Sequence, residues 1–196
     1  MTETSVAVKE ESKRKMQCVS GDINYILPFL KWMLRARGDK FGPPSLMCIF
    51  ADQYGWTCTD GKRLHHYQYE HEGQPILDMQ GLYSVEFVKK QGTAQTIFAP
   101  QDGDYPDYRR IIPKDYVEWP IMLQLKHKQD SKSLSIALAR IITGPLKGKS
   151  VIDYSYLKDL GGYDWLIFTA KRHPYNQSIM FVSGRCMAIV MPIELR

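Results

Sequence analysis

The arrangement of short apolar runs between turn residues limits the fold of this chain more than any other feature of the sequence. Apolar residues at helical spacing occur in three stretches, which predict helices at 23–37, 81–90 and 153–160. Elsewhere the apolar runs are short and are bounded by Gly, Pro or Asp. None approaches the roughly 18 residues that a membrane-spanning helix needs. The pattern predicts an α+β fold with antiparallel sheets and about three helices, and no membrane partner.

The expected strands follow from turn signals on either side of each run. Two hairpins are predicted, one from 46–50 to 55–58 and one from 121–128 to 134–142. Segment 101–113 is rich in Gly, Asp and Pro, which predicts a long loop. Further strands are expected at 63–69, 96–98, 165–170, 178–182 and 186–192.

Length and charge limit the number of domains and the kind of partner. A chain of 196 residues, 44% of them hydrophobic, is long enough for one domain or two compact ones with packed cores. Residues 1–17 are polar and of mixed charge, which predicts a flexible N-terminal tail without the apolar stretch of a signal peptide. Lys and Arg outnumber Asp and Glu by 26 to 21, and the resulting charge of +5 is compatible with binding to nucleic acid. We therefore expect a cytoplasmic protein.

The cysteines are too far apart in sequence to indicate a zinc or redox motif, because no CxxC pair is present. We expect them to be reduced and mostly buried, as in a reducing compartment. They are Cys18, Cys48, Cys58 and Cys186.

Two motifs suggest enzymatic chemistry, and each has a structural explanation. Gly144–Ser150 resembles a phosphate-binding loop but has three residues between its glycines where that loop has four. His65 and His66 are neighbours on an expected strand, so they point to opposite faces, and we expect an exposed polar strand there with His71 beyond it. We expect no enzyme, no metal and no cofactor. The alternative is a metal- or nucleotide-dependent enzyme that uses His65, His66 or the loop around Lys149.

Three separated segments resemble one family. Thr59–Leu64 (TDGKRL) resembles the T-D-G-x-R-L turn of the bacterial DNA polymerase III beta sliding clamp, and Asp102–Lys114 (DGDYPDYRRIIPK) is similar to the connector between its second and third domains. Ile189–Leu195 (IVMPIEL) is similar to the C-terminal end of that family. The three segments follow one another in the family's order. The resemblance implies a DNA-clamp-like fold with a second-domain unit at 18–114 and a shortened third-domain unit at 115–196, in which the hairpin at 121–142 replaces a helix.

In the clamp family these segments form a hydrophobic groove that captures short linear peptides of DNA polymerase, the clamp loader and repair proteins. The resemblance therefore implies a groove here, with Leu64, Ile111 and Met191 receiving apolar side chains, and Arg63 and Arg110 bonding the peptide. The expected groove residues are Thr59, Gly61, Lys62, Arg63, Leu64, Pro106, Arg110, Ile111, Ile189, Val190, Met191, Pro192, Ile193 and Leu195. The expected contacts with double-stranded DNA are Lys31, Arg35, Lys89 and Lys90, on helices that would face DNA.

The function implied by the resemblance is that of a non-enzymatic, nucleoid-associated protein of DNA replication or repair. It would bind clamp-interacting peptides and encircle or contact DNA as a homo-oligomeric processivity factor. The alternative is a decoy or adaptor of a phage or mobile element, which keeps the groove, forms no ring and competes with or recruits host replication proteins.

Overall fold

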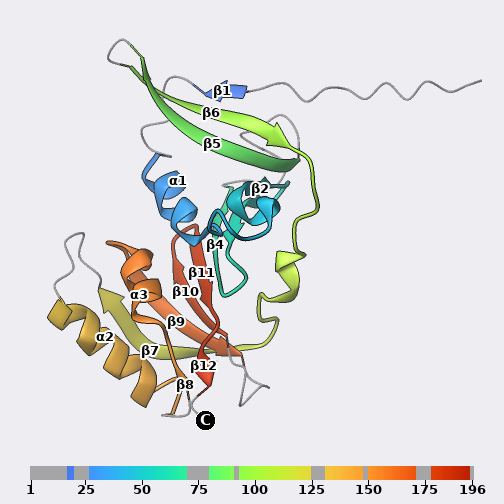
Figure 1. Ribbon diagram of the computed structural model, residues 1–196. Coiled ribbons are helices and arrows are strands. Elements are labelled where there is room, and N and C mark those ends of the chain that lie inside the picture. The colour runs from blue at the N-terminus through green and yellow to red at the C-terminus, as the bar shows by residue number, and fades with distance from the viewer. Residues whose placement is uncertain are drawn as a thin grey trace, which may run out of the picture.

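The computed structural model describes residues 17–19, 27–69, 80–90, 93–124, 131–147, 150–170 and 178–194. In this part of the chain, ten strands form one sheet in the order β1-β6-β5-β2-β3-β4-β11-β10-β9-β7, while β12 and β8 form a separate pair (Figure 1). Every pair of neighbouring strands is antiparallel. With three α-helices beside the sheet, the predicted α+β class is confirmed.

Short 3-10 helices (η2 to η4) complete the set of elements. In chain order the elements are β1 (Gln17–Val19), α1 (Leu27–Met33), η2 (Leu34–Ala36), η3 (Pro44–Met47), β2 (Ile49–Ala51), β3 (Gly55–Thr59), β4 (Arg63–Gln68), β5 (Gly81–Lys90), β6 (Thr93–Gln101), η4 (Tyr108–Arg110), β7 (Tyr116–Gln124), α2 (Ser131–Thr143), β8 (Ser150–Val151), α3 (Tyr154–Leu160), β9 (Asp164–Ala170), β10 (Ile179–Ser183), β11 (Cys186–Val190) and β12 (Ile193–Glu194).

The two halves of the chain join within the sheet. Strand β4 of the first half pairs with β11 of the second half, from Arg63 opposite Val190 to Tyr67 opposite Cys186. Residues 102–115, here called the connector, leave β6 and cross to β7 over one face of the sheet (Figure 1). The other face is covered by α1, α2 and α3.

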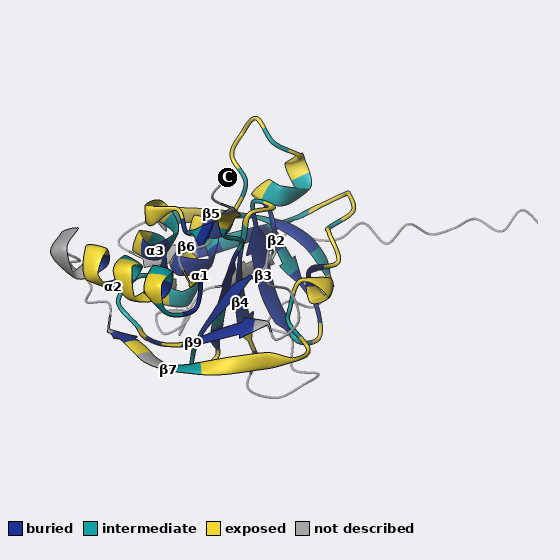
Figure 2. Cartoon of the chain, turned by 90° about the horizontal axis from the view of Figure 1, so that it is seen from below, coloured by how far each residue is buried: buried dark blue, intermediate teal, exposed yellow. Residues whose placement is uncertain are grey.

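The main core lies between the sheet and the helices. Strand residues point alternately to the two faces, so that Trp56, Trp165 and Phe181 meet the helices and are fully buried there. The opposite face carries a smaller apolar cluster, in which Tyr108 of the connector packs on the sheet. Its buried members are Leu64, Tyr108, Phe168, Met180 and Ile189. Figure 2 shows buried strands at the centre and exposed residues along β7 and the connector.

Two predicted elements are wrong. Segment 81–90 is strand β5 and not a helix, because it pairs with β6 from Leu82 to Lys90 and also with β2. Segment 131–143 is helix α2 and not half of a hairpin, since Leu134, Ala137 and Ile141 form one buried stripe at helical spacing. A helix is therefore present where the sequence predicted that a hairpin replaces one.

The remaining predictions agree well with the observed elements. Helix α1 begins later than expected and has Pro28 in its first turn, the helical position that tolerates proline. Helix α3 begins after Asp153, whose carboxylate accepts the Ser155 backbone N–H at 2.8 Å. The expected strand 46–50 is only partly strand, because Pro44–Met47 forms η3 before β2 begins. The expected tail, residues 1–17, lies outside the described residues except for Gln17.

Candidate functional site

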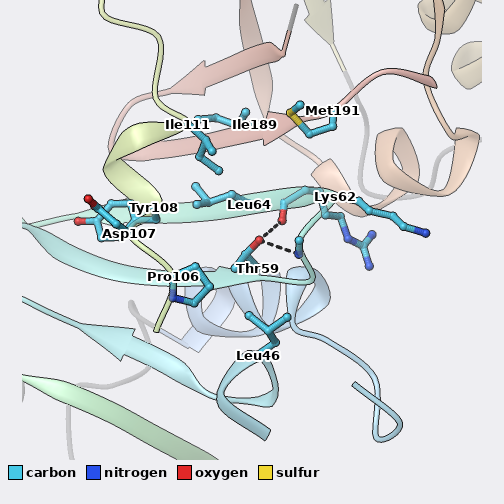
Figure 3. Close-up of a pocket in the computed structure, with 12 residues that line it drawn as sticks. Leu46, Thr59, Lys62, Leu64, Pro106, Asp107, Tyr108, Ile111, Ile189 and Met191 are labelled. Atoms are coloured by element: carbon cyan, nitrogen blue, oxygen red, sulfur yellow. Dashed lines mark hydrogen bonds between the residues drawn. The ribbon is translucent and has the colours of Figure 1, made fainter. Parts of the chain in front are cut away.

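A mostly apolar pocket of about 210 Å³ lies on the connector face of the sheet (Figure 3). We call it the Leu64 pocket. Its wall is made by three segments that are far apart in sequence, together with one residue of η3. The lining residues are Leu46, Thr59, Gly61, Lys62, Arg63, Leu64, Pro106, Asp107, Tyr108, Ile111, Ile189 and Met191.

Strand register builds the floor of the pocket. Leu64 of β4 lies between Thr59 of β3 and Ile189 of β11, its direct partners in the two neighbouring strands. Alternation sends Leu64 and Ile189 to the connector face and Val190 into the main core, where it is fully buried. Leu64, Ile111 and Ile189 point toward one another across the floor (Figure 3).

The turn between β3 and β4 forms one rim and is held by its own side chains. Thr59 Oγ1 donates to the Arg63 carbonyl at 2.6 Å and accepts from Gly61 N at 3.1 Å. Asp60 Oδ1 accepts the backbone N–H groups of Lys62 and Arg63, each at 2.9 Å. Gly61 has a φ of +86°, a conformation that favours glycine. The sequence T-D-G thus fixes the rim locally, before any ligand binds.

The connector forms the opposite rim and is tied to the sheet by two tyrosines. The Tyr108 hydroxyl donates to Asp52 Oδ2 at 2.9 Å, and the Tyr105 hydroxyl donates to the Thr57 carbonyl at 3.3 Å. Tyr105 also stacks on Phe50, with ring centroids 5.0 Å apart. Burial, followed by the bond to Asp52, raises the pKa of Tyr108 well above its ordinary value, so the hydroxyl stays a donor. These bonds hold Pro106, Tyr108 and Ile111 at the pocket.

Arg63 links the pocket rim to α3 of the second half. Its guanidinium bonds to Asp60, pairs with the Asp159 carboxylate and lies 4.7 Å from the Tyr156 ring centroid. Its side chain is 13% exposed, so the donors that the resemblance would assign to a peptide are directed to residues of the chain itself. Arg35 reaches the same helix end by donating to the Asp159 carbonyl at 3.4 Å.

Most of the residues expected in the groove line the Leu64 pocket, but four of those that the structure describes do not. The Arg110 side chain is 84% exposed and does not line the pocket, although it pairs with the lining residue Asp107. Val190 belongs to the core, and Pro192 and Ile193 follow Met191 away from the lining. Leu195 lies outside the described residues. Three lining residues were not expected: Leu46, Asp107 and Tyr108. Asp107 and Tyr108 lie within the connector segment that carried the resemblance, whereas η3 gave no sequence signal for Leu46.

The residues expected to contact DNA do not share one kind of element. Lys31 and Arg35 are exposed on α1 and η2, on the helix-covered face of the sheet. Lys89 and Lys90 belong to strand β5, so their expected place on a helix is wrong.

The side chains of His65 and His66 are buried, so the expected exposed polar strand at this position is wrong. His65 faces α1 and its Nδ1 lies 2.9 Å from the Trp32 carbonyl, while His66 faces the connector and stacks on Tyr108. Burial lowers the pKa of His65 to about 3 and that of His66 to about 4. Cys48, Cys58 and Cys186 are free thiols and buried. In the part of the chain that the structure describes, no group of three or more potential ligands could hold a metal ion.

The loop named in the alternative of a nucleotide-dependent enzyme is described only in part. Lys149 and His71 lie outside the described residues, and Gly144–Lys147 follows the end of α2. Among the described residues no helix is long and apolar enough to span a membrane.

The sheet, the helices on one face and the connector on the other define the fold of a DNA sliding clamp. No protein-family model and no curated protein sequence matches the chain. More narrowly, the fold is that of the beta subunit of bacterial DNA polymerase III in a shortened form, as the following solved structures show.

The beta chain from Streptococcus pneumoniae is 12% identical and has a TM-score of 0.58, over 98% of this chain and 68% of that chain. The subunit from Pseudomonas aeruginosa is 14% identical with a TM-score of 0.58, over 97% of this chain and 69% of that chain. The beta subunit from Streptococcus pyogenes is 10% identical with a TM-score of 0.57, over 97% of this chain and 69% of that chain. The chain thus spans about two thirds of these clamps, and the expected clamp-like fold is confirmed.

Proposed function

We propose that the Leu64 pocket binds short linear peptides of DNA polymerase, clamp loader or repair proteins, and that the chain acts in DNA replication or repair without catalysing a reaction. The observation that carries this proposal is the meeting of three distant segments, 59–64, 106–111 and 189–191, around one pocket. If these segments met only to form part of the core, their side chains would fill the space between them and leave no pocket. An open pocket offers apolar surface to a ligand instead.

The chemistry of the pocket suits a peptide with apolar side chains. Leu46, Leu64 and Ile189 provide branched apolar surface, and Met191 adds a flexible side chain that adapts to different partners. Burying one Leu or Phe side chain contributes about 1.5–3 kcal/mol, so two such side chains contribute about 3–6 kcal/mol, a large part of the roughly −8 kcal/mol of a micromolar complex.

Fluorescence anisotropy tests the proposal directly. A labelled pentapeptide with Leu and Phe as its apolar residues is titrated with the protein and with Ile111→Ala and Met191→Ala. We expect each substitution to weaken binding by about tenfold to thirtyfold, because it removes two or three carbons of contact surface. Ile136→Ala is the matched control, since Ile136 is 47% exposed on α2, beyond the sheet from the pocket. A folded protein that does not bind the peptide would overturn the proposal.

Ring formation is the second part of the proposed clamp role. Within the described residues the sheet ends in two edge strands, β1 and β7. Edge β7 exposes the apolar side chains of Tyr116, Val117 and Met122, and an unpaired edge of this kind favours pairing with another copy. We expect a homo-oligomer in sedimentation experiments, retained on circular DNA and released from linear DNA. A strict monomer would exclude the ring.

DNA contact is proposed for the helix-covered face. Lys31 and Arg35 are exposed there, away from the pocket, so peptide and DNA would not compete for one surface. Binding to duplex DNA should weaken as the salt concentration rises. Lys31→Ala should make the slope of log K against log salt concentration less steep by about the value of one phosphate contact. Salt-independent binding would contradict this assignment.

The decoy or adaptor alternative needs the pocket but no ring. It is favoured by the position of the whole pocket within one chain, since peptide binding then requires no second copy. A monomer that displaces a host clamp from polymerase in a pull-down would support this alternative. A monomer that fails to compete would exclude it.

A further inference from the structure

A second pocket lies beside the first on the connector face of the sheet. Its volume is about 370 Å³, within the range of small-ligand sites. We call it the Arg109 pocket. Its lining includes Tyr54, His66, Tyr108, Arg109, Arg185 and Met187.

The two pockets share one wall and a common floor. Tyr108 lines both of them. On β4 the floor residues are Leu64 in the first pocket and His66 in the second, and on β11 they are Ile189 and Met187. Two residues of strand separate the floors, a distance of about 7 Å. An extended peptide in the first pocket therefore needs two or three more residues to reach the second.

The described lining of the second pocket carries basic side chains. Arg109 and Arg185 belong to it, and none of the lining residues that the structure describes is Asp or Glu. The Asp52 carboxylate is buried, and its Oδ2 lies 3.7 Å from the Arg109 guanidinium. That oxygen already accepts the Tyr108 hydroxyl, while Oδ1 accepts the backbone N–H groups of Tyr54 and Gly55. Asp52 therefore bonds to residues of the chain itself and only partly offsets the charge of the Arg109 guanidinium.

Arg109 is positioned to receive an acidic group. Its guanidinium lies 5.0 Å from the Tyr54 ring centroid and 5.8 Å from that of Tyr108, and these two cation–π contacts favour its position at the pocket. The side chain is 56% exposed and donates no hydrogen bond to another residue of the described chain. Its N–H donors are therefore available to an incoming carboxylate, which a guanidinium binds in a two-pronged geometry.

We infer that the Arg109 pocket binds an acidic side chain of the same peptide whose apolar residues occupy the Leu64 pocket. The inference rests on the proposed function and narrows it to partners with Asp or Glu two or three residues from their apolar residues. Met180, Val182 and Met187 provide apolar walls for the methylene groups of that side chain.

The test compares labelled peptides that differ only in an extension. The Leu- and Phe-containing pentapeptide is extended by Ser-Asp-Asp or by Ser-Ser-Ser, at either end, and titrated with the wild type, Arg109→Gln and Lys114→Gln. Lys114 is the matched control because it is an exposed cation of the same connector that lines neither pocket. We expect one acidic extension to bind about tenfold more tightly than its serine counterpart in the wild type and in Lys114→Gln, and to lose this gain in Arg109→Gln.

Three outcomes decide the inference. If acidic and serine extensions bind alike at both ends, or if the gain survives in Arg109→Gln, the inference is wrong while the proposed function stands. If the unextended pentapeptide fails to bind the folded wild type, the proposed function fails and the inference fails with it. Should Arg109→Gln unfold, the wild type decides by itself: a gain of the acidic extension that does not shrink as the salt concentration rises would overturn the inference.

Discussion

The bond between Tyr108 and Asp52 joins the connector to the sheet, and its removal gives a sharp prediction. Tyr108→Phe keeps the ring that stacks on His66 at 5.4 Å and removes only the hydroxyl that donates to Asp52 Oδ2 at 2.9 Å. Asp52 is 3% exposed, so water replaces that donor poorly. A hydrogen bond to a charged acceptor contributes about 1.5–3 kcal/mol. We expect the free energy of unfolding to fall by that amount.

Tyr105→Phe is the matched comparison within the same connector. Its hydroxyl donates to a neutral acceptor, the Thr57 carbonyl, at the longer distance of 3.3 Å. Such a bond contributes about 0.5–1.5 kcal/mol. Urea unfolding followed by tryptophan fluorescence gives both values, and thermal unfolding should show a drop of about 2–4 °C per kcal/mol lost. The reasoning is refuted if Tyr108→Phe costs no more than Tyr105→Phe.

The remaining predictions concern a histidine, an ion pair and a close backbone contact. The pKa of His66 falls from 6.5 to about 4 on folding, so the unfolded state binds more protons than the folded state between these pH values. The free energy of unfolding should therefore fall as the pH drops from 6.5 to 4. In urea unfolding, His66→Asn should lower the slope of this free energy against pH by about 1.4 kcal/mol per pH unit. Arg63→Ala and Asp159→Ala should show a coupling of about 0.5–3 kcal/mol in a double-mutant cycle. Gly55→Ala should cost about 3 kcal/mol or more, because the new Cβ would lie 2.1 Å from the Tyr67 carbonyl oxygen.

Each of these predictions has an outcome that contradicts it. Equal pH slopes for the wild type and His66→Asn would show that His66 is not buried in its neutral form. Additive losses for the two single variants at Arg63 and Asp159 would remove the link between the pocket rim and α3. A cost near 1 kcal/mol for Gly55→Ala would mean that the two strands separate easily at that point.

Local sequence could specify the turn and the connector but not every element. Thr59, Asp60 and Gly61 fix the β3–β4 turn through bonds among near neighbours, so the motif alone predicts it. Segment 81–90 is different, since Leu82, Val85 and Val88 fit a helix while Tyr83, Val85 and Phe87 fit a strand. Pairing with β6 and β2 stabilises the strand over the helix.

Helix α2 shows the opposite case, in which the helical signal was present but ambiguous. Leu134, Ile136 and Leu138 alternate as in a strand, whereas Leu134, Ala137 and Ile141 follow a helical period. The structure buries the second set and leaves Ile136 47% exposed. Contact of the buried stripe with the sheet and with α3 determines that the segment is a helix. Periodicity over nine residues cannot distinguish the helix from a strand.

The sequence by itself determined the α+β class and the segments that form the Leu64 pocket, because turn chemistry and motifs act over a few residues. Tertiary structure decided which side chains reach the pocket. The register of β4 and β11 turns Ile189 toward the connector and Val190 into the core, and η3 brings Leu46 to the rim. The same structure directs Arg63 to Asp159 and leaves Arg109 with exposed donors. A one-residue change of register would exchange the two faces of a strand, and register is fixed only when the strands pair.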